Sequence, residues 1–520
     1  MGASDGSRWH KFATANGEKT LVFEWRGVVK YLPLILCGGF FAFSALWLAI
    51  GPLDWHISNL PLLYSFLGLC LLALIAGYTY GIRRRESKGS STRRVVVLNP
   101  NRILIATGFV ALVLYFPTVY ATTGAWFPDV WGGLTHAGDA YRNTKSLNVT
   151  SSPLILYVRF LLSPLLILAA PLTYFLWPRL SWLARILGLA CVLGTVSLSI
   201  AQGINKGMAD LTAYTCLFLI LVAASSLRRG RRRRLLGALV GAVLVSAVFL
   251  SYYAINIQSR IAGDAERAAS SASESHNPPG RDSGQTISDG DVAKALDNQA
   301  NLGGIASERQ GHFIFALPSN LRASTLVLSS YMTHPYRGLS MALAENWTPT
   351  FGLGFSEFFR HNISKALGGD KFEAATEAQT YAGKISAKGW PVGQVWATFF
   401  IYPASDISFP GVILLLAAIG CFFATSWRDT VTRGDPLAAG VFFSLCALVF
   451  YLPANNQLFQ GGETAVGFTV IFVLWLLARS GALKRWPRFF RGRSQKPDLN
   501  SAEATEIAPP RSSWKMTLIV

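Results

Sequence analysis

Side chains that can bind an anion and move a proton are concentrated between residues 309 and 345. They are Arg309, Arg322, His334, Tyr336, Arg337 and Glu345. Arginine pairs well with phosphate oxygens, and a carboxylate or an imidazole can serve as a general base. The eight-residue step from Arg337 to Glu345 is about two helical turns, so both side chains are expected to face one cleft. Glu345 is the first candidate for the base, His334 is the alternative, and ordinary surface salt bridges are the competing interpretation.

Three further cations lie elsewhere in the chain. Arg159 interrupts the apolar stretch PLILYVRFLLSPL, Lys206 lies in the short turn GINKGMAD, and Arg142 lies in GDAYRNTKS. A charge inside an apolar stretch is costly and marks a functional candidate. The alternatives are snorkelling of Arg159 to the headgroups, a simple polar connector around Lys206, and a solvated loop around Arg142. Taken with the 309–345 group, these cations predict a site for an anionic, lipid-linked substrate.

The sequence predicts neither a metal site nor a cofactor. The histidines form no HExxH or HxH pair, and the six cysteines lie in apolar stretches without a CxxC partner. We interpret these cysteines as small buried hydrophobic residues.

The composition decides the class of protein that carries these residues. Of the 520 residues, 51% are hydrophobic and only 14% are charged, and the mean hydropathy is +0.35. Soluble chains carry about 25% charged residues. The composition therefore predicts an all-α polytopic membrane protein. It excludes a disordered chain, a disulfide-stapled domain and a nucleic-acid binder.

Ten stretches are long and apolar enough to span a bilayer. They are 31–51, 59–81, 103–123, 153–177, 185–204, 209–227, 235–255, 408–427, 436–453 and 464–479. Two further pieces, 322–344 and 390–404, are expected to form a re-entrant or interfacial pair, which would raise the number of membrane segments to twelve.

These spans divide the chain into four parts. An N-terminal membrane domain with seven spans (1–255) precedes a large, largely helical outer segment (256–407), of which 262–300 is expected to be mobile. A C-terminal membrane domain with three spans (408–480) and a basic cytoplasmic tail (481–520) follow.

The basic residues predict the orientation. The runs RRRESKGSSTRR and RRGRRRR must face the cytoplasm by the positive-inside rule, which places both termini there and 256–407 outside. The net charge of +19 is thus a consequence of topology rather than of nucleic-acid binding. The polar start, MGASDGSRWHKFATANGEKT, predicts no cleavable signal peptide.

Four stretches resemble the Wzy-type O-antigen and exopolysaccharide repeat-unit polymerases, which are related to O-antigen ligases. They are GINKGMAD, YMTHPYRGLSMALAENWTPTFGLG, KGWPVGQVWATFFIYPASDISFPGVILLLAAIG and LPANNQLFQGG. Trp396-Ala397-Thr398 resembles the family's W-x-T, and Asp406-Ile407-Ser408-Phe409-Pro410-Gly411 resembles its Asp-Phe-Gly-like helix start. The arginine–glycine spacing of some members is absent here.

The resemblance implies a GT-C-like glycosyltransferase of the bacterial cytoplasmic (inner) membrane. It would join oligosaccharide repeat units linked to undecaprenyl diphosphate on the outer face, without a cofactor. It also implies that Arg142, Arg309, Arg322 and Arg337 handle the diphosphate. The expected partners are the lipid-linked donor and acceptor, membrane lipids, a flippase and a chain-length regulator, with no nucleic acid.

Other functions compete with this one. An O-antigen ligase would use the same scaffold and donor with a different acceptor. GT-C enzymes that use a polyprenyl-monophosphate sugar carry a carboxylate pair in the first outer loop, where this chain has only Asp54 in GPLDWHIS. A transporter or lipid-linked-oligosaccharide flippase would place its site near the midplane, often between repeated halves, whereas the polar residues here lie in the outer segment. A non-catalytic assembly subunit is the last alternative.

Overall fold

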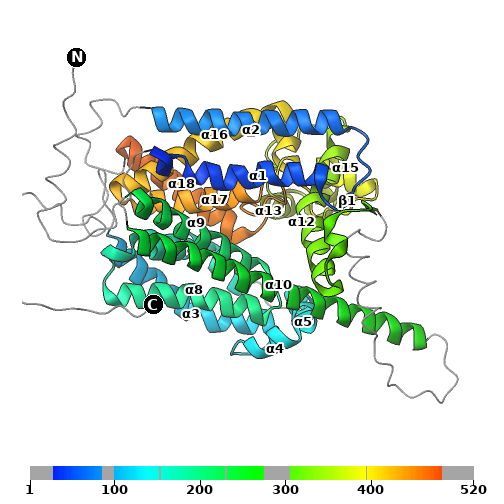
Figure 1. Ribbon diagram of the computed structural model, residues 1–520, viewed down its shortest axis with the longest axis horizontal. Helices are drawn as coiled ribbons and strands as arrows, with labels where there is room; N and C mark the ends of the chain where they lie inside the picture. Colours follow the sequence, from blue (N-terminus) through cyan, green and yellow to red (C-terminus); the bar gives the residue numbers. More distant parts are fainter. Residues whose placement is uncertain are drawn as a thin grey trace, which may run out of the picture.

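The computed structural model describes residues 27–84, 99–150, 154–228, 231–274, 305–393 and 395–482. These residues are predominantly helical (Figure 1). The described strands are two residues long, β1 (Leu53–Asp54) and β2 (Ser307–Glu308), and they pair antiparallel with Leu53 opposite Glu308. The prediction of an all-α polytopic membrane protein is therefore confirmed.

Nine helical segments among the described residues are long and apolar enough to cross a membrane. They are α1 (Leu32–Ile50), α2 (Leu60–Arg83), α3 (Pro100–Thr123), α6 (Leu154–Leu166) continued by α7 (Ala169–Leu176) and η2 (Trp177–Arg179), α8 (Trp182–Ala201), α9 (Lys206–Arg228), α10 (Arg232–Glu274), α16 (Ile401–Arg433) and α18 (Gly462–Ser480). The tenth predicted span, 436–453, contains a shorter helix, α17 (Pro436–Phe450).

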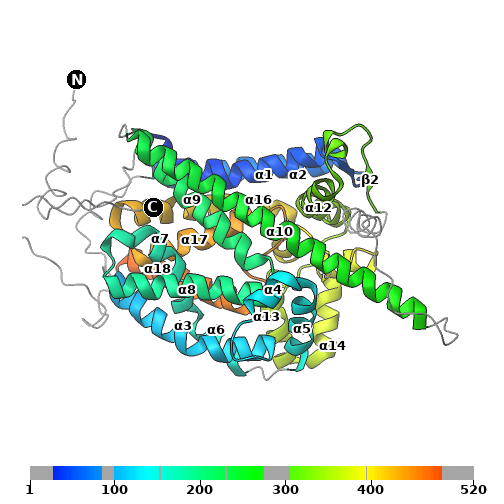
Figure 2. The ribbon, with the colours of Figure 1, turned by 60° about the horizontal axis from the view of Figure 1, so that its bottom comes forward.

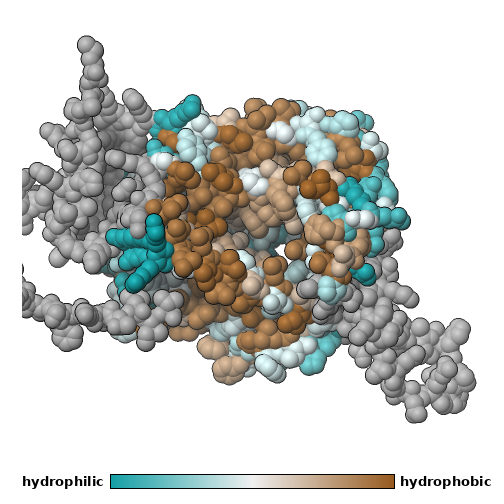
Figure 3. Space-filling model, in the orientation of Figure 1, coloured by the Kyte–Doolittle hydropathy of each residue, from teal (hydrophilic) through white to brown (hydrophobic). Residues whose placement is uncertain are grey.

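The two ends of this helix bundle differ in chemistry. One end, which we call the basic end, carries arginines where helices begin or stop, among them Arg83, Arg179, Arg232, Arg433 and Arg479. Between the ends runs a belt of apolar side chains, with hydrophilic side chains at either side of it (Figure 3). Such a belt matches the hydrocarbon core of a bilayer.

The opposite end, which we call the loop end, holds the remaining helices. They are α4 (Val130–Thr135), α5 (Ala137–Thr150), η3 (Phe313–Ala316), α12 (Ser319–Leu343), α13 (Glu357–Leu367), α14 (Gly369–Gln379) and α15 (Tyr381–Ala387), while η1 (Gly27–Lys30) precedes α1. Helix α12 lies across the bundle (Figure 1), and α4, α5, α13 and α14 gather beside α3 and α6 (Figure 2). The outer segment is thus largely helical where it is described.

The structure differs in part from two predictions for the outer segment. Helix α10 continues to Glu274, so residues 262–274 of the segment expected to be mobile are helical, and 275–300 lie outside the described residues. Of the two expected re-entrant or interfacial pieces, the first forms α12, which is not among the candidate spans. The second includes Phe400, whose ring lies against Phe41 of α1 and Phe66 of α2.

Helices α2 and α16 are in direct backbone contact through glycine. A Cβ atom added to Gly77 would lie 1.8 Å from the carbonyl oxygen of Ala417, and one added to Gly420 would lie 2.3 Å from that of Leu74. Small residues allow this close approach between helices in a membrane, where packing rather than water exclusion drives association. This contact holds the middle of α16 against α2.

Replacing Gly77 with leucine should therefore destabilise the bundle, because backbone rather than a mobile side chain occupies the space. We expect a loss of about 1–3 kcal/mol or more, measured as a lower thermal unfolding midpoint of the purified protein in detergent. Gly68→Leu on the same helix is the matched control, since a Cβ at Gly68 has no neighbour within 4 Å. Equal midpoints for the two variants would contradict the contact.

A candidate polar site at the loop end

Residues 451–461, the loop between α17 and α18, begin well inside the bundle, because α17 ends there. Helix α17 has 15 residues, or about 22 Å at 1.5 Å per residue, against a hydrocarbon thickness of about 30 Å. Its last residue, Phe450, stacks on Phe40 with ring centroids 4.3 Å apart. Helix α1 continues beyond Phe40 to Ile50, a rise of about 15 Å. The 451–461 loop therefore begins below the loop end of α1.

Two buried asparagines form hydrogen bonds with backbone and side-chain groups around this loop. Asn456 is 1% exposed, and its amide donates to the carbonyl oxygen of Phe355 at 2.7 Å. Asn455 donates to the side chain of Gln460 at 2.8 Å. The Ser356 hydroxyl, which caps α13, donates to the carbonyl oxygen of Phe459. These bonds fasten the 451–461 loop to the start of α13.

The carboxylate of Asp406 organises the neighbouring loop, residues 350–355. One oxygen accepts from the Thr350 hydroxyl at 2.6 Å and from the N–H groups of Gly352 and Gly354, and the other accepts from the N–H of Phe355 at 2.8 Å. Two residues later, Ser408 has a φ of +62°, and α16 kinks there. Asp406, the first residue of the Asp406–Gly411 motif, is thus a half-buried anchor that ties the backbone of residues 350–355 to the start of α16.

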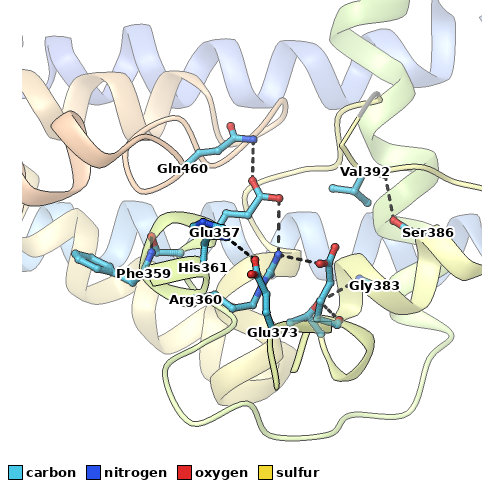
Figure 4. Close-up of polar contacts among 12 residues, drawn as sticks. Glu357, Phe359, Arg360, His361, Glu373, Gly383, Ser386, Val392 and Gln460 are labelled. Carbon is cyan, nitrogen blue, oxygen red and sulfur yellow. Dashed lines mark hydrogen bonds and ion pairs between the residues drawn. The ribbon is translucent and has the colours of Figure 1, made fainter. Parts of the chain in front are cut away.

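Beside these loops lies a buried arginine, Arg360, in α13. It is 4% exposed, and its Nη2 lies 3.9 Å from a Glu357 oxygen and 3.7 Å from a Glu377 oxygen. Glu357 also accepts from the Gln460 amide at 3.3 Å. Figure 4 shows the guanidinium between carboxylates, with Gln460 reaching in from the 451–461 loop. We call Arg360, Glu357, Glu377 and Gln460 the Arg360 cluster.

The Arg360 cluster has unused hydrogen-bonding capacity. Within the described residues, the buried Nε of Arg360 has no hydrogen-bond partner, and neither has the hydroxyl of Ser364 one helical turn further along α13. Buried polar groups are nearly always paired, so these two atoms on one helix face are unusual and leave hydrogen-bonding capacity unused. The cluster offers a fixed cation, two carboxylates that are 37% and 51% exposed, and neutral donors.

Arg159 lies on the other side of the same loop. Its guanidinium makes a two-pronged pair with Glu463 in the first turn of α18, with Nη2 2.8 Å from the second oxygen, and Nη1 donates to the Thr118 hydroxyl at 2.9 Å. The guanidinium of Arg159 is thus paired within the protein, whereas snorkelling to the headgroups was the alternative to the predicted anion site. The ring of the adjacent Phe160 lies 5.0 Å from that of Phe358, the residue after Glu357, so Arg159 and the Arg360 cluster border one region.

Lys206 reaches the first residue of the loop through Asp210. Its Nζ lies 3.3 Å from one Asp210 oxygen, and the hydroxyl of Tyr451 donates to the other at 2.8 Å. Lys206 and Arg159 are therefore both connected to the 451–461 loop, one near each end of it.

Arg309, Arg337 and Tyr336 gather instead around the corner between α1 and β1. Arg309 donates to the carbonyl oxygens of Leu48, Ala49 and Gly51, and Arg337 donates to that of Trp55. The Tyr336 hydroxyl is buried and lies 2.7 Å from the Ser44 hydroxyl. These side chains close the end of α1 and hold α12 against it. The two arginines donate to backbone carbonyl groups, which a diphosphate would have to displace.

The remaining cationic candidates, Arg142 and Arg322, lie on α5 and α12. Arg142 pairs with Asp139 on α5, and that carboxylate is 64% exposed. Arg322 lies in the first turns of α12, where its N–H donates to the carbonyl oxygen of Pro318.

His334 is buried in α12 with both ring nitrogens engaged. The N–H of Trp396 donates to Nε2 at 3.2 Å, so the ring proton is on Nδ1, which donates to the carbonyl oxygen of Ser330 at 2.8 Å. Burial lowers the pKa of His334 from 6.5 to about 4. A neutral imidazole that is bonded on both sides supports the fold and has no free nitrogen to act as a base.

The expectation that Arg337 and Glu345 face one cleft assumed a helical step that the structure does not have. Helix α12 ends at Leu343, so the two-turn projection does not extend to Glu345. Glu345 forms an ion pair with Lys388 after α15, whereas Arg337 faces Trp55. The two residues do not share a cleft.

Sequence reasoning missed Arg360, Glu357 and Glu377. The stretch SEFFRHNISKAL contains a signal, because Ser356, Arg360 and Ser364 recur every four residues and define one polar helix face. That spacing usually marks the solvent side of a helix. Here the face is buried, with all three residues at most 4% exposed.

Comparison with protein-family models, with curated proteins and with solved structures finds no match for this chain. Within the described residues, no group of three or more histidine, cysteine, aspartate or glutamate side chains could hold a metal ion. The function is therefore inferred from the site itself.

The state of His334 makes a prediction about pH. Between about pH 6.5 and pH 4 the unfolded chain binds a proton that the folded chain does not, so stability should fall as the pH drops through this window. The full effect is of the order of 3 kcal/mol. His334→Gln should flatten the dependence of the unfolding midpoint between pH 7.5 and 5, whereas His136→Gln, at an exposed site, should not. Identical slopes in all three proteins would refute the assignment.

Proposed function

We propose that this chain is a membrane glycosyltransferase that joins lipid-linked oligosaccharide repeat units, a polymerase of the Wzy type with GT-C-like architecture. In this proposal the basic end faces the cytoplasm, following the positive-inside rule. The loop end then faces the outer side of the bacterial cytoplasmic membrane, where undecaprenyl-diphosphate-linked substrates would reach it.

The observation that carries the proposal is the Arg360 cluster. A guanidinium that is 4% exposed lies between two carboxylates at 3.7 and 3.9 Å with its Nε unpaired, beside a recessed loop. A chain that needed only a stable fold would bury an apolar side chain there, because burying a charge with incomplete pairing is costly. Such costs are tolerated at functional sites.

The chemistry of glycosyl transfer matches these groups. The bond between the donor sugar and the diphosphate breaks, its electron pair leaves with the diphosphate, and a hydroxyl oxygen of the acceptor sugar forms the new bond. A carboxylate takes the hydroxyl proton, and cations stabilise the leaving group. We assign the base to Glu357, which is 37% exposed on its side chain. Glu345, the base expected from the sequence, is held by Lys388.

Two cations are available for the leaving group. Arg360 has an unpaired Nε, and Arg159 borders the same loop through its pair with Glu463. Glu463 keeps the charge of Arg159 compensated when no substrate is bound. Arg309 and Arg337 then take a structural role at the α1–β1 corner in place of the diphosphate contacts that the family resemblance implies.

A ligase remains the second candidate, because it would make and break the same bonds with a different acceptor. A flippase is less well supported by the position of the cluster. The Arg360 cluster lies on α13 and α14 at the loop end, whereas transport sites lie near the midplane.

Arg360→Gln should lower the rate of polymerisation by about 100-fold, the cost of removing one group that stabilises developing charge. The amount of protein in the membrane should stay close to that of the wild type. Lys365→Gln, on an exposed position of the same helix, is the matched control. Polymer length profiles of cells that express each variant provide the measurement, and normal polymer with Arg360→Gln would contradict the assignment.

A deletion strain separates the candidate functions. Loss of a polymerase leaves surface glycan as single repeat units, loss of a ligase leaves full-length polymer on its lipid carrier, and loss of a flippase leaves repeat units on the cytoplasmic side. We expect single repeat units, and either of the other two outcomes would overturn the proposal.

A further inference from the structure

The connection between α3 and α4, at the loop end, exposes three large aromatic side chains. Trp126, Phe127 and Trp131 are 56%, 73% and 76% exposed. The stretch that carries them, GAWFPDVW (124–131), contains one charged residue, Asp129, whose carboxylate caps α4. Exposed apolar groups gathered in this way mark a surface that contacts a partner or a membrane. We call residues 124–131 the aromatic loop.

Helix α3, which leads into the aromatic loop, carries an apolar stripe along one face. Four exposed side chains recur there every three or four residues, the spacing of a single helix face. They are Phe109, Leu112, Phe116 and Tyr120. Because α3 is long and apolar enough to cross a membrane, its exposed apolar stripe is expected to face the acyl chains of the bilayer.

The rings of the aromatic loop fold back onto this stripe. Trp126 stacks on Tyr120 with ring centroids 4.8 Å apart, and the ring of Phe127 lies 5.5 Å from that of Phe116. Helix α3 ends at Thr123, so the two contacts lie about 5 and 10 Å before its end. The aromatic loop therefore continues the lipid-facing side of α3 instead of projecting from the bundle into water.

The aromatic loop and the Arg159–Glu463 pair lie on opposite sides of α3. Thr118 is between Phe116 and Tyr120 in sequence, and a step of two residues turns a helix by about 200°. Thr118 is 3% exposed and accepts a hydrogen bond from Arg159. A sugar bound beside Arg159 would be separated from the aromatic rings by α3. The position of the rings thus favours lipid over carbohydrate as their partner.

The chemistry of the exposed rings identifies the depth at which they lie. Tryptophan is enriched where headgroups meet acyl chains, because its ring is apolar and its N–H needs a hydrogen-bond acceptor. We propose that the aromatic loop is inserted into the lipid leaflet at the loop end, at the boundary between headgroups and acyl chains. This inference does not depend on the proposed function. It places the Arg159–Glu463 pair, which contacts Thr118, at the height of that boundary.

Depth-dependent fluorescence quenching tests this placement. Full-length Phe127→Cys protein is labelled with bimane and reconstituted into liposomes of phosphatidylethanolamine and phosphatidylglycerol. A nitroxide is carried by the lipid headgroup, by the upper part of the acyl chain or by the chain end. The bimane should be quenched most by the headgroup and upper-chain nitroxides, and only weakly by iodide in the water. The wild-type protein, taken through the same labelling, measures the signal from the native cysteines.

Two further labelled positions calibrate the depth scale. Phe109→Cys lies on the same stripe, about 16 Å from Tyr120 along α3, and should be quenched most by the nitroxide at the chain end. Lys371→Cys, at an exposed position of α14, should be quenched by iodide and only weakly by the lipid nitroxides.

Trp131→Cys provides an independent position in the aromatic loop, and the proposal requires that its label also be quenched by lipid nitroxides. Iodide quenching at Phe127 and Trp131 as strong as that at Lys371 would place the loop in water and overturn the proposal. Protection of both labels from iodide and from every lipid nitroxide would show that protein, such as a second copy of this chain, covers the loop. That result would overturn the proposal as well.

Discussion

Backbone that leaves the helix inside an apolar bundle must find its hydrogen bonds within the protein, and this requirement shapes the whole loop end. For residues 350–355, the Asp406 carboxylate supplies these hydrogen bonds by accepting from three N–H groups and one hydroxyl. In the 451–461 loop, the side-chain amide of Asn456 donates to the carbonyl oxygen of Phe355. Because the two loops are fastened to each other and residues 350–355 are fastened to α16, the side chains that they carry are held in place.

The arginines of the loop end fall into two groups according to the acceptors to which their guanidinium groups bind. Arg309 and Arg337 donate hydrogen bonds to backbone carbonyl groups and so stabilise the fold. Arg159 and Arg360 face carboxylates instead, and a carboxylate can exchange its partner when an anion arrives. Arg360 keeps its Nε unpaired within the described structure. A buried cation that is only loosely compensated is suited to bind charge that develops during a reaction.

Hydropathy predicted the spans well, because a length of apolar sequence is nearly sufficient to specify a membrane helix. It overestimated α17, since Tyr451, Leu452 and Pro453 continue the apolar stretch but belong to a buried loop rather than to the helix. Hydropathy reports burial and not backbone conformation. The site was predicted less well for two physical reasons. First, helix α12 ends at Leu343, so the two helical turns expected between Arg337 and Glu345 are not completed. Second, the polar face of α13 that contains Arg360 is buried rather than exposed to solvent.

Reconstitution tests most directly whether this chain forms glycosidic bonds between lipid-linked oligosaccharides, as we propose. The purified protein in liposomes would be given one synthetic repeat unit on polyprenyl diphosphate, and the products and released lipid would be quantified together. A polymerase yields a ladder of repeat-unit multiples with one polyprenyl diphosphate released for each new linkage. Movement of the unchanged substrate across the bilayer, or no consumption of it, would overturn the proposed function.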